Sequence, residues 1–119
     1  GVPGVAPARA VILGAGVVGM NAARIAYAMG MRVTVINRGI ERLRTVDEHF
    51  QGRVQTMPST EFNIRKAVAE ADVLIGAVLV TGAKAPVLVN WQNQSSMLQC
   101  SAVVYASARV NLTVVVRYR

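Results

Sequence analysis

The sequence predicts an α/β protein, with a doubly wound parallel sheet covered by helices, and three observations support this fold class. Short apolar runs without alternation recur along residues 10–78, and segments with helical spacing separate them. A glycine-rich segment joins the first apolar run to the first helical segment. Hydrophobic residues make up 53% of the 119 residues, which suffices for the core of one domain and excludes a disordered chain.

The apolar runs predict the strands, and the spacing of apolar residues between them predicts the helices. The run at residues 10–13 ends at a glycine and is typical of a strand buried on both faces. A helix is predicted over residues 17–29, with Gly30 as its C-cap glycine. Its apolar residues at helical spacing are Val18, Ala22, Ile25, Ala26 and Met29. Further strands are expected at residues 32–36, 53–57 and 73–78, and further helices begin at Ile40 and after Thr60.

The alternation of strands and helices predicts the topology. Right-handed crossovers make the strands parallel, with the order 3-2-1-4-5 across the sheet. The fifth strand is expected at residues 102–105, and residues 112–116 are a candidate sixth strand. Residues 1–9 are rich in proline and glycine and are expected to form a lead-in arm to the domain.

The composition excludes several classes of function. The net charge of +7 comes from basic residues scattered singly, which argues against a nucleic-acid partner. A single cysteine, Cys100, and a single histidine, His49, exclude an internal disulfide and a cysteine- or histidine-rich metal site, and no metal ligand is assigned. No secretion signal or membrane span is visible, so we expect a cytoplasmic protein without a membrane partner.

Residues 14–19, GAGVVG, fit the pattern G-x-G-x-x-G between a predicted strand and a predicted helix. Gly14 permits the tight turn, Gly16 lets the backbone approach a pyrophosphate, and Gly19 lets the helix pack closely on the sheet. The unpaired N–H groups of the first helical turn then favour phosphate. Residues 10–119 are therefore predicted to be a Rossmann-type dinucleotide-binding domain. In the alternative, the glycines serve only the turn.

The end of the second strand bears on which dinucleotide binds. NAD-binding domains place an acidic residue about 20 residues past the loop, where it accepts hydrogen bonds from the ribose. This sequence has Asn37 there, and Arg38 and Arg42 follow. An amide does not repel a 2′-phosphate and an arginine can bind one with two donors, so these residues admit NADP. In the alternative, Asn37 starts a turn and Arg38 is solvated.

Several stretches carry a resemblance to a known family. They are residues 1–8 (GVPGVAPA), 12–23 (ILGAGVVGMNAA), 40–44 (IERLR), 71–79 (ADVLIGAVL) and 82–86 (GAKAP). Over about residues 1–89 the chain closely resembles the cofactor domain of bacterial alanine dehydrogenases, and less closely that of proton-translocating transhydrogenases. The resemblance implies an NAD-binding domain that positions the cofactor for hydride transfer from L-alanine, giving pyruvate and ammonia. It also implies a substrate domain outside this chain and a homo-oligomer.

The resemblance further implies a set of cofactor-binding residues. Gly14, Gly16, Val17, Val18 and Gly19 would hold the pyrophosphate, Asn37 would lie at the adenosine ribose, Ser59 near the adenine, and Val78 and Leu79 beside the ribose and nicotinamide. NAD is the cofactor that the family implies, and Asn37 and Arg38 admit NADP.

Residues 90–119 depart from the family pattern. Where the family has a catalytic aspartate after the fifth strand, this sequence has Arg109, and Tyr105 replaces an acidic residue. We therefore assign no catalytic residue and expect this chain alone to be inactive. The alternative function is a stand-alone or engineered NAD(P)-binding module without turnover.

Overall fold

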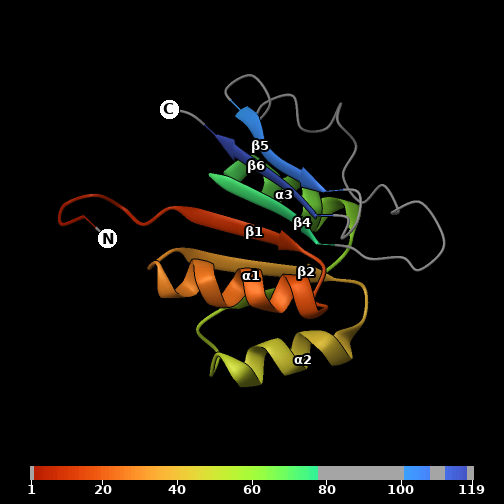
Figure 1. Ribbon diagram of the computed structural model, residues 1–119. Helices are drawn as coiled ribbons and strands as arrows, with labels where there is room; N and C mark the ends of the chain where they lie inside the picture. The colour runs from red at the N-terminus through yellow and green to blue at the C-terminus, as the bar shows by residue number, and fades with distance from the viewer. Residues whose placement is uncertain (1, 78–100, 108–111, 118–119) are drawn as a thin grey trace.

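The structure, a computed structural model, describes residues 2–77, 101–107 and 112–117 (Figure 1). The strands are β1 (Arg9–Leu13), β2 (Arg32–Asn37), β3 (Gln55–Pro58), β4 (Val73–Ala77), β5 (Ser101–Ser107) and β6 (Leu112–Arg117). The helices are α1 (Val17–Ala28), α2 (Ile40–His49) and α3 (Glu61–Glu70). These elements confirm the predicted alternation, with small shifts at their ends. None of the described helices is long and apolar enough to cross a bilayer.

The sheet has the strand order β3-β2-β1-β4-β6-β5. The strands β3, β2, β1 and β4 are parallel, which confirms the predicted fold class. In contrast, β6 is antiparallel to both β4 and β5, so the expected order 3-2-1-4-5 is wrong beyond β4. A parallel crossover needs about a dozen residues. Since only residues 108–111 separate β5 from β6, these strands pair as antiparallel neighbours, and β6 lies beside β4.

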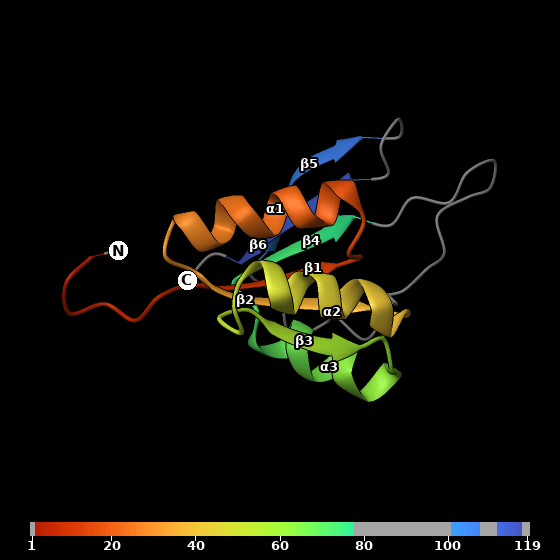
Figure 2. The same cartoon turned by 90° about the horizontal axis from the view of Figure 1, so that it is seen from below.

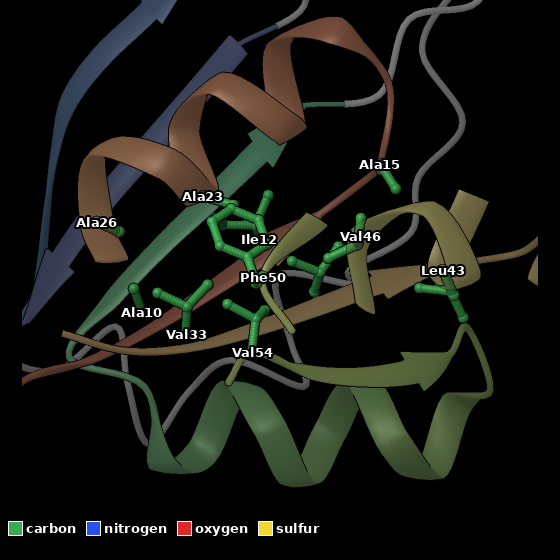
Figure 3. Packing of buried hydrophobic residues seen from close by; sticks show 11 residues of the cluster. Ala10, Ile12, Ala15, Ala23, Ala26, Val33, Leu43, Val46, Phe50 and Val54 are labelled. Carbon is green, nitrogen blue, oxygen red and sulfur yellow. The ribbon is translucent and has the colours of Figure 1, made fainter. Parts of the chain in front are cut away.

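The central strand β1 is buried on both faces, as its unalternating apolar run predicts. Ala10 and Ile12 belong to the core cluster under α1 and α2, whereas Val11 and Leu13 belong to the cluster under α3. Figure 2 shows α1 and α2 on one face of the sheet and α3 on the other. Figure 3 shows the first cluster, to which the two helices contribute Ala23, Ala26, Leu43 and Val46. The two clusters together fix the carboxyl ends of the parallel strands relative to the helices that follow them.

The helix α1 meets the sheet through small residues, because its buried residues are Gly19, Ala23 and Ala26. Two of the larger apolar residues at helical spacing, Ile25 and Met29, are 64% and 61% exposed. The spacing therefore predicts the helix correctly, but the residues that face the sheet are those small enough to let the helix approach it closely.

Both α1 and α2 end in a left-handed turn closed by backbone hydrogen bonds. After α1, Gly30 has a φ of +83° and donates its N–H to the carbonyl of Tyr27 (2.9 Å), which confirms its predicted place at the helix end. After α2, Gln51 takes the same place with a φ of +54° and donates to Glu48 (3.3 Å). A residue with a Cβ pays roughly 1–2 kcal/mol for this conformation. Gln51 is therefore a strained position.

Replacing Gln51 by glycine is expected to stabilise the fold. Glycine relieves the strain at this position but loses more conformational entropy on folding than glutamine does. The relief of strain is the larger effect, so the free energy of unfolding should rise by about 0.5–1 kcal/mol and Tm by about 2–5 °C. Thermal and urea unfolding followed by circular dichroism measure the change. The control is Gln51→Ala, which keeps the Cβ and should give no comparable gain. Equal stability of Gln51→Gly and Gln51→Ala would contradict the assignment of strain.

Candidate functional site

The glycine-rich loop lies at the carboxyl edge of the parallel sheet, between the end of β1 and the start of α1 (Figure 1). Gly14 has a φ of +107°, and its N–H donates to the carbonyl of Ile36 on β2 (2.8 Å). This bond holds the turn against the neighbouring strand, and the tight turn predicted at Gly14 is confirmed. Ligands of doubly wound sheets bind outside the carboxyl ends of the strands, which is where the loop lies.

The other two glycines of the loop differ in their surroundings. A Cβ at Gly19 would collide with the carbonyl group of Gly14, so α1 starts in direct contact with the loop. A Cβ at Gly16 would meet no atom of the described residues within 4 Å. Gly16 also has an ordinary φ of −78°, so neither backbone conformation nor packing within the described chain requires a glycine there. The described part of the chain thus leaves room for a ligand beside Gly16.

The first turn of α1 presents uncapped N–H groups to that space. Gly16 is the N-cap and offers no side-chain acceptor, and no acidic residue lies in the first turn. The helix α3 differs, because Thr60 accepts a hydrogen bond from the N–H of Asn63 (3.2 Å) and Glu61 lies in its first turn. The helix α2 has Glu41 in its first turn. Of the three described helices, α1 alone thus leaves the positive end of its dipole without a cap or an acid.

Asn37, at the end of β2, links the loop to the start of α2. Its Oδ1 accepts the N–H of Ala15 (3.2 Å), and its Nδ2 donates to the carbonyl of Gly39 (3.0 Å). A backbone donor and a backbone acceptor therefore fix both ends of the amide, which defines its orientation. The sequence predicted that Asn37 lies near the dinucleotide ribose but missed that it also holds the glycine-rich loop.

The remaining predicted site residues fall into two groups. Ser59 lies beside the end of β2, where its N–H donates to the carbonyl of Asn37 (3.1 Å). The buried hydroxyl of Ser59 has no hydrogen-bond partner among the described residues. Arg38 is exposed and makes no hydrogen bond or ion pair within the described chain. Val78, Leu79, Cys100 and Arg109 lie outside the described residues.

An open hollow of about 350 Å³ adjoins the loop, between α1 and α2. Its lining residues come from the loop, from the first two turns of α1 and from α2. They are Ala15, Gly16, Val17, Met20, Asn21, Arg24, Arg42 and Thr45. Sequence reasoning missed Arg24 and Thr45, because only the crossing of the two helices brings them beside the loop.

A second hollow, of about 280 Å³, lies on the α3 side of the sheet. It is lined by the first and third residues of β1, β2 and β3, and by Lys66, Ala67 and Glu70 of α3. It therefore lies near the amino ends of these strands, away from the loop. This position makes it the weaker candidate for a ligand site in a parallel sheet.

The fold and the loop define a doubly wound α/β domain with a glycine-rich loop at the carboxyl edge of its sheet. Residues 1–109 match the family model described as alanine dehydrogenase/PNT, C-terminal domain. The chain belongs to this family, which confirms the resemblance drawn from its motifs.

Three similar proteins illustrate the match. The chain is 51% identical over 104 residues to an alanine dehydrogenase of Halomonas elongata, covering 87% of this chain and 28% of that protein. It is 56% identical over 89 residues to an alanine dehydrogenase of Mycolicibacterium smegmatis, covering 75% of this chain and 24% of that protein. A solved structure of an L-alanine dehydrogenase superposes with a TM-score of 0.75 at 48% identity, covering 78% of this chain and 26% of the other. The chain thus spans about a quarter of the length of these relatives.

The different surroundings of Gly19 and Gly16 predict that these two positions of the loop tolerate a methyl group very differently. Gly19→Ala should destabilise the fold by more than about 2 kcal/mol, because the new Cβ has to displace backbone. Gly16→Ala is the matched control and should change stability by less than about 0.5 kcal/mol. Urea unfolding of both variants checks this pair. Equal stabilities would show that α1 does not rest on the loop as described.

Proposed function

We propose that this chain is the NAD-binding domain of an alanine-dehydrogenase-like oxidoreductase. The observation that carries the proposal is the environment of Gly16. No contact and no backbone angle within the described chain requires glycine there, and the described residues leave the space beside it open. A bound pyrophosphate gives a reason for glycine there, because its oxygens need the room that a side chain would fill. The alternative, in which the glycines serve only the turn, explains Gly14 and Gly19 but not Gly16.

The chemistry of the loop fits a dinucleotide. The N–H groups of Val17, Val18 and Gly19 receive no side-chain cap from the described residues. They point along the axis of α1 towards its amino end, where phosphate charge is stabilised by the helix dipole. The amide of Asn37 keeps an unused lone pair and one N–H for ribose hydroxyls. The unpartnered hydroxyl of Ser59 is a further polar group for the adenosine end. These residues bind and orient the cofactor, and Val78 and Leu79 are proposed beside its nicotinamide end.

The activity of the relatives comes to this chain as a proposal, because the chain spans only 28% of the first of them. When bound, the nicotinamide would accept a hydride from Cα of L-alanine, and water would then release pyruvate and ammonia. The chain's own part is to hold the cofactor at the carboxyl edge of the sheet. A substrate domain outside these residues would bind the amino acid and handle its protons, and the assembly would be a homo-oligomer.

The cofactor preference is also part of the proposal. NAD is the cofactor that the family implies. Asn37 places an amide where a carboxylate would repel a 2′-phosphate, and the guanidinium of Arg38 has no competing partner in the described chain. We infer that NADPH binds at least as well as NADH at low salt, and that its advantage shrinks as salt screens the arginine.

The loop assignment is tested with Gly16→Val. The valine side chain would fill the pyrophosphate position, and its Cβ would meet no atom of the described chain within 4 Å, so NADH affinity should fall by at least about tenfold while the fold remains. Nicotinamide fluorescence titration gives the affinity, and circular dichroism checks the fold. Val54, a buried residue under α2, provides a control, since Val54→Ala should lower stability but not NADH affinity in the folded protein. An unchanged affinity in folded Gly16→Val would overturn the assignment.

The cofactor preference is tested with Asn37→Asp and Arg38→Ala. A carboxylate facing a phosphate is costly, so Asn37→Asp should weaken NADPH by at least about tenfold relative to NADH. Arg38→Ala should weaken NADPH and leave NADH nearly unchanged, because the lost charge-assisted hydrogen bond contributes about 1.5–3 kcal/mol, and less where exposed to solvent. Paired titrations at low and high salt measure both effects. Tenfold tighter binding of NADH than of NADPH by the unaltered chain would show that the NAD preference of the family holds.

A further inference from the structure

We propose that the hollow on the α3 side of the sheet binds a compact dianion, such as a phosphate or a small dicarboxylate, through Arg32 and Lys66. Figure 2 shows α3 on the face of the sheet opposite α1 and α2, and the hollow of about 280 Å³ is lined by α3 and the first three strands. It lies near the amino ends of these strands, whereas the glycine-rich loop lies at their carboxyl ends. An anion bound here therefore does not depend on the dinucleotide.

The strand register places like charges side by side on this face. Arg9 of β1 and Arg32 of β2 are register partners on adjacent parallel strands, and both line the hollow. Like charges directly opposite each other on neighbouring strands are destabilising. Lys66 adds a third positive charge to the lining from α3. An anion bound between these side chains would offset their repulsion.

The acidic groups near the hollow are already engaged by Arg9. Glu70 is the one acidic residue among the described residues that line the hollow, and its Oε2 accepts a hydrogen bond from Nη1 of Arg9 (3.2 Å). Asp72, outside the lining, accepts the backbone N–H of Arg9 (3.0 Å). The side chains of Arg32 and Lys66 make no hydrogen bond or ion pair within the described chain. Two positive charges thus remain for a ligand, and a dianion would balance them.

The neutral polar side chains of the hollow add hydrogen-bond donors. Thr34 and Gln55 are register partners on β2 and β3, and both line the hollow. Oγ1 of Thr34 donates to Oε1 of Gln55 (3.4 Å), so the amide oxygen is used and the amide nitrogen keeps its two N–H donors. The guanidinium of Arg32 and the ammonium of Lys66 are also donors only. A set of donors with a positive charge is the complement of an oxyanion.

The test is an amide NMR titration of the isotope-labelled 119-residue chain with phosphate in its dianionic form, at low ionic strength. Signals of Arg32, Thr34 and Gln55 report the hollow, and those of the first turn of α1 report any phosphate bound at the glycine-rich loop. Phosphate and oxalate should each shift the hollow signals with a dissociation constant of about 1 mM or less. Acetate, with one charge, should bind at least about fivefold more weakly.

Matched variants show whether the named cations hold the anion. Arg32→Gln and Lys66→Gln should each weaken phosphate at the hollow by at least about fivefold. The control is Arg65→Gln, which removes the same charge from the neighbouring residue of α3, where Arg65 pairs with Glu61 (2.6 Å) outside the hollow. It should leave the affinity within about twofold. Circular dichroism confirms that each variant is folded.

The outcomes separate an anion site from solvated surface charges and from the proposed function. The site is overturned if phosphate leaves the hollow signals unmoved or shifts only the loop signals. An equal loss of affinity in Arg65→Gln would also overturn it, since the effect would then come from overall charge. Equal binding of acetate and phosphate would contradict a dianion. Gly16→Val should keep the phosphate affinity of the hollow, so the site stands or fails independently of dinucleotide binding at the loop.

Discussion

The contact between the first turn of α1 and the carbonyl group of Gly14 determines the geometry of the whole carboxyl edge. Because Gly19 has no side chain, the helix begins directly on the loop that leaves β1. The small residues Ala23 and Ala26 continue this close approach along the sheet. The N–H groups of the first turn are thereby placed beside the open space at Gly16, and Asn37 holds the loop from the other side through Ala15. Cofactor binding, as we propose it, depends on this arrangement.

The sequence predicted the parallel part of the fold because β1, β2 and β4 are short apolar runs between segments of helical spacing. It failed beyond β4, where the antiparallel pairing of β5 and β6 depends on the short connection between them and not on the apolar pattern. Apolar spacing also could not show which side of α1 meets the sheet. Residue size decides that, so Ala23 is buried and Ile25 is exposed.

The candidate site was predictable where it is local in sequence and was not where it depends on tertiary contacts. The spacing of Gly14, Gly16 and Gly19 indicates the loop, and the distance along the chain to Asn37 indicates the end of β2. The hydrogen bond from Ala15 to Asn37 and the approach of Arg24 to α2 join segments that are distant in sequence. Such contacts follow from how the helices pack, so only the structure shows that two arginines flank one hollow beside the loop.

The most direct test of cofactor binding at the glycine-rich loop is an amide NMR titration of the isotope-labelled chain with NADH. Amide signals report binding at each backbone N–H without relying on turnover or on cofactor fluorescence. Cofactor binding at the glycine-rich loop predicts that the largest changes fall on Val17, Val18 and Gly19, with a further change at Ala15, whose N–H donates to Asn37. Unchanged signals in the first turn of α1, or changes confined to the hollow beside α3, would contradict it.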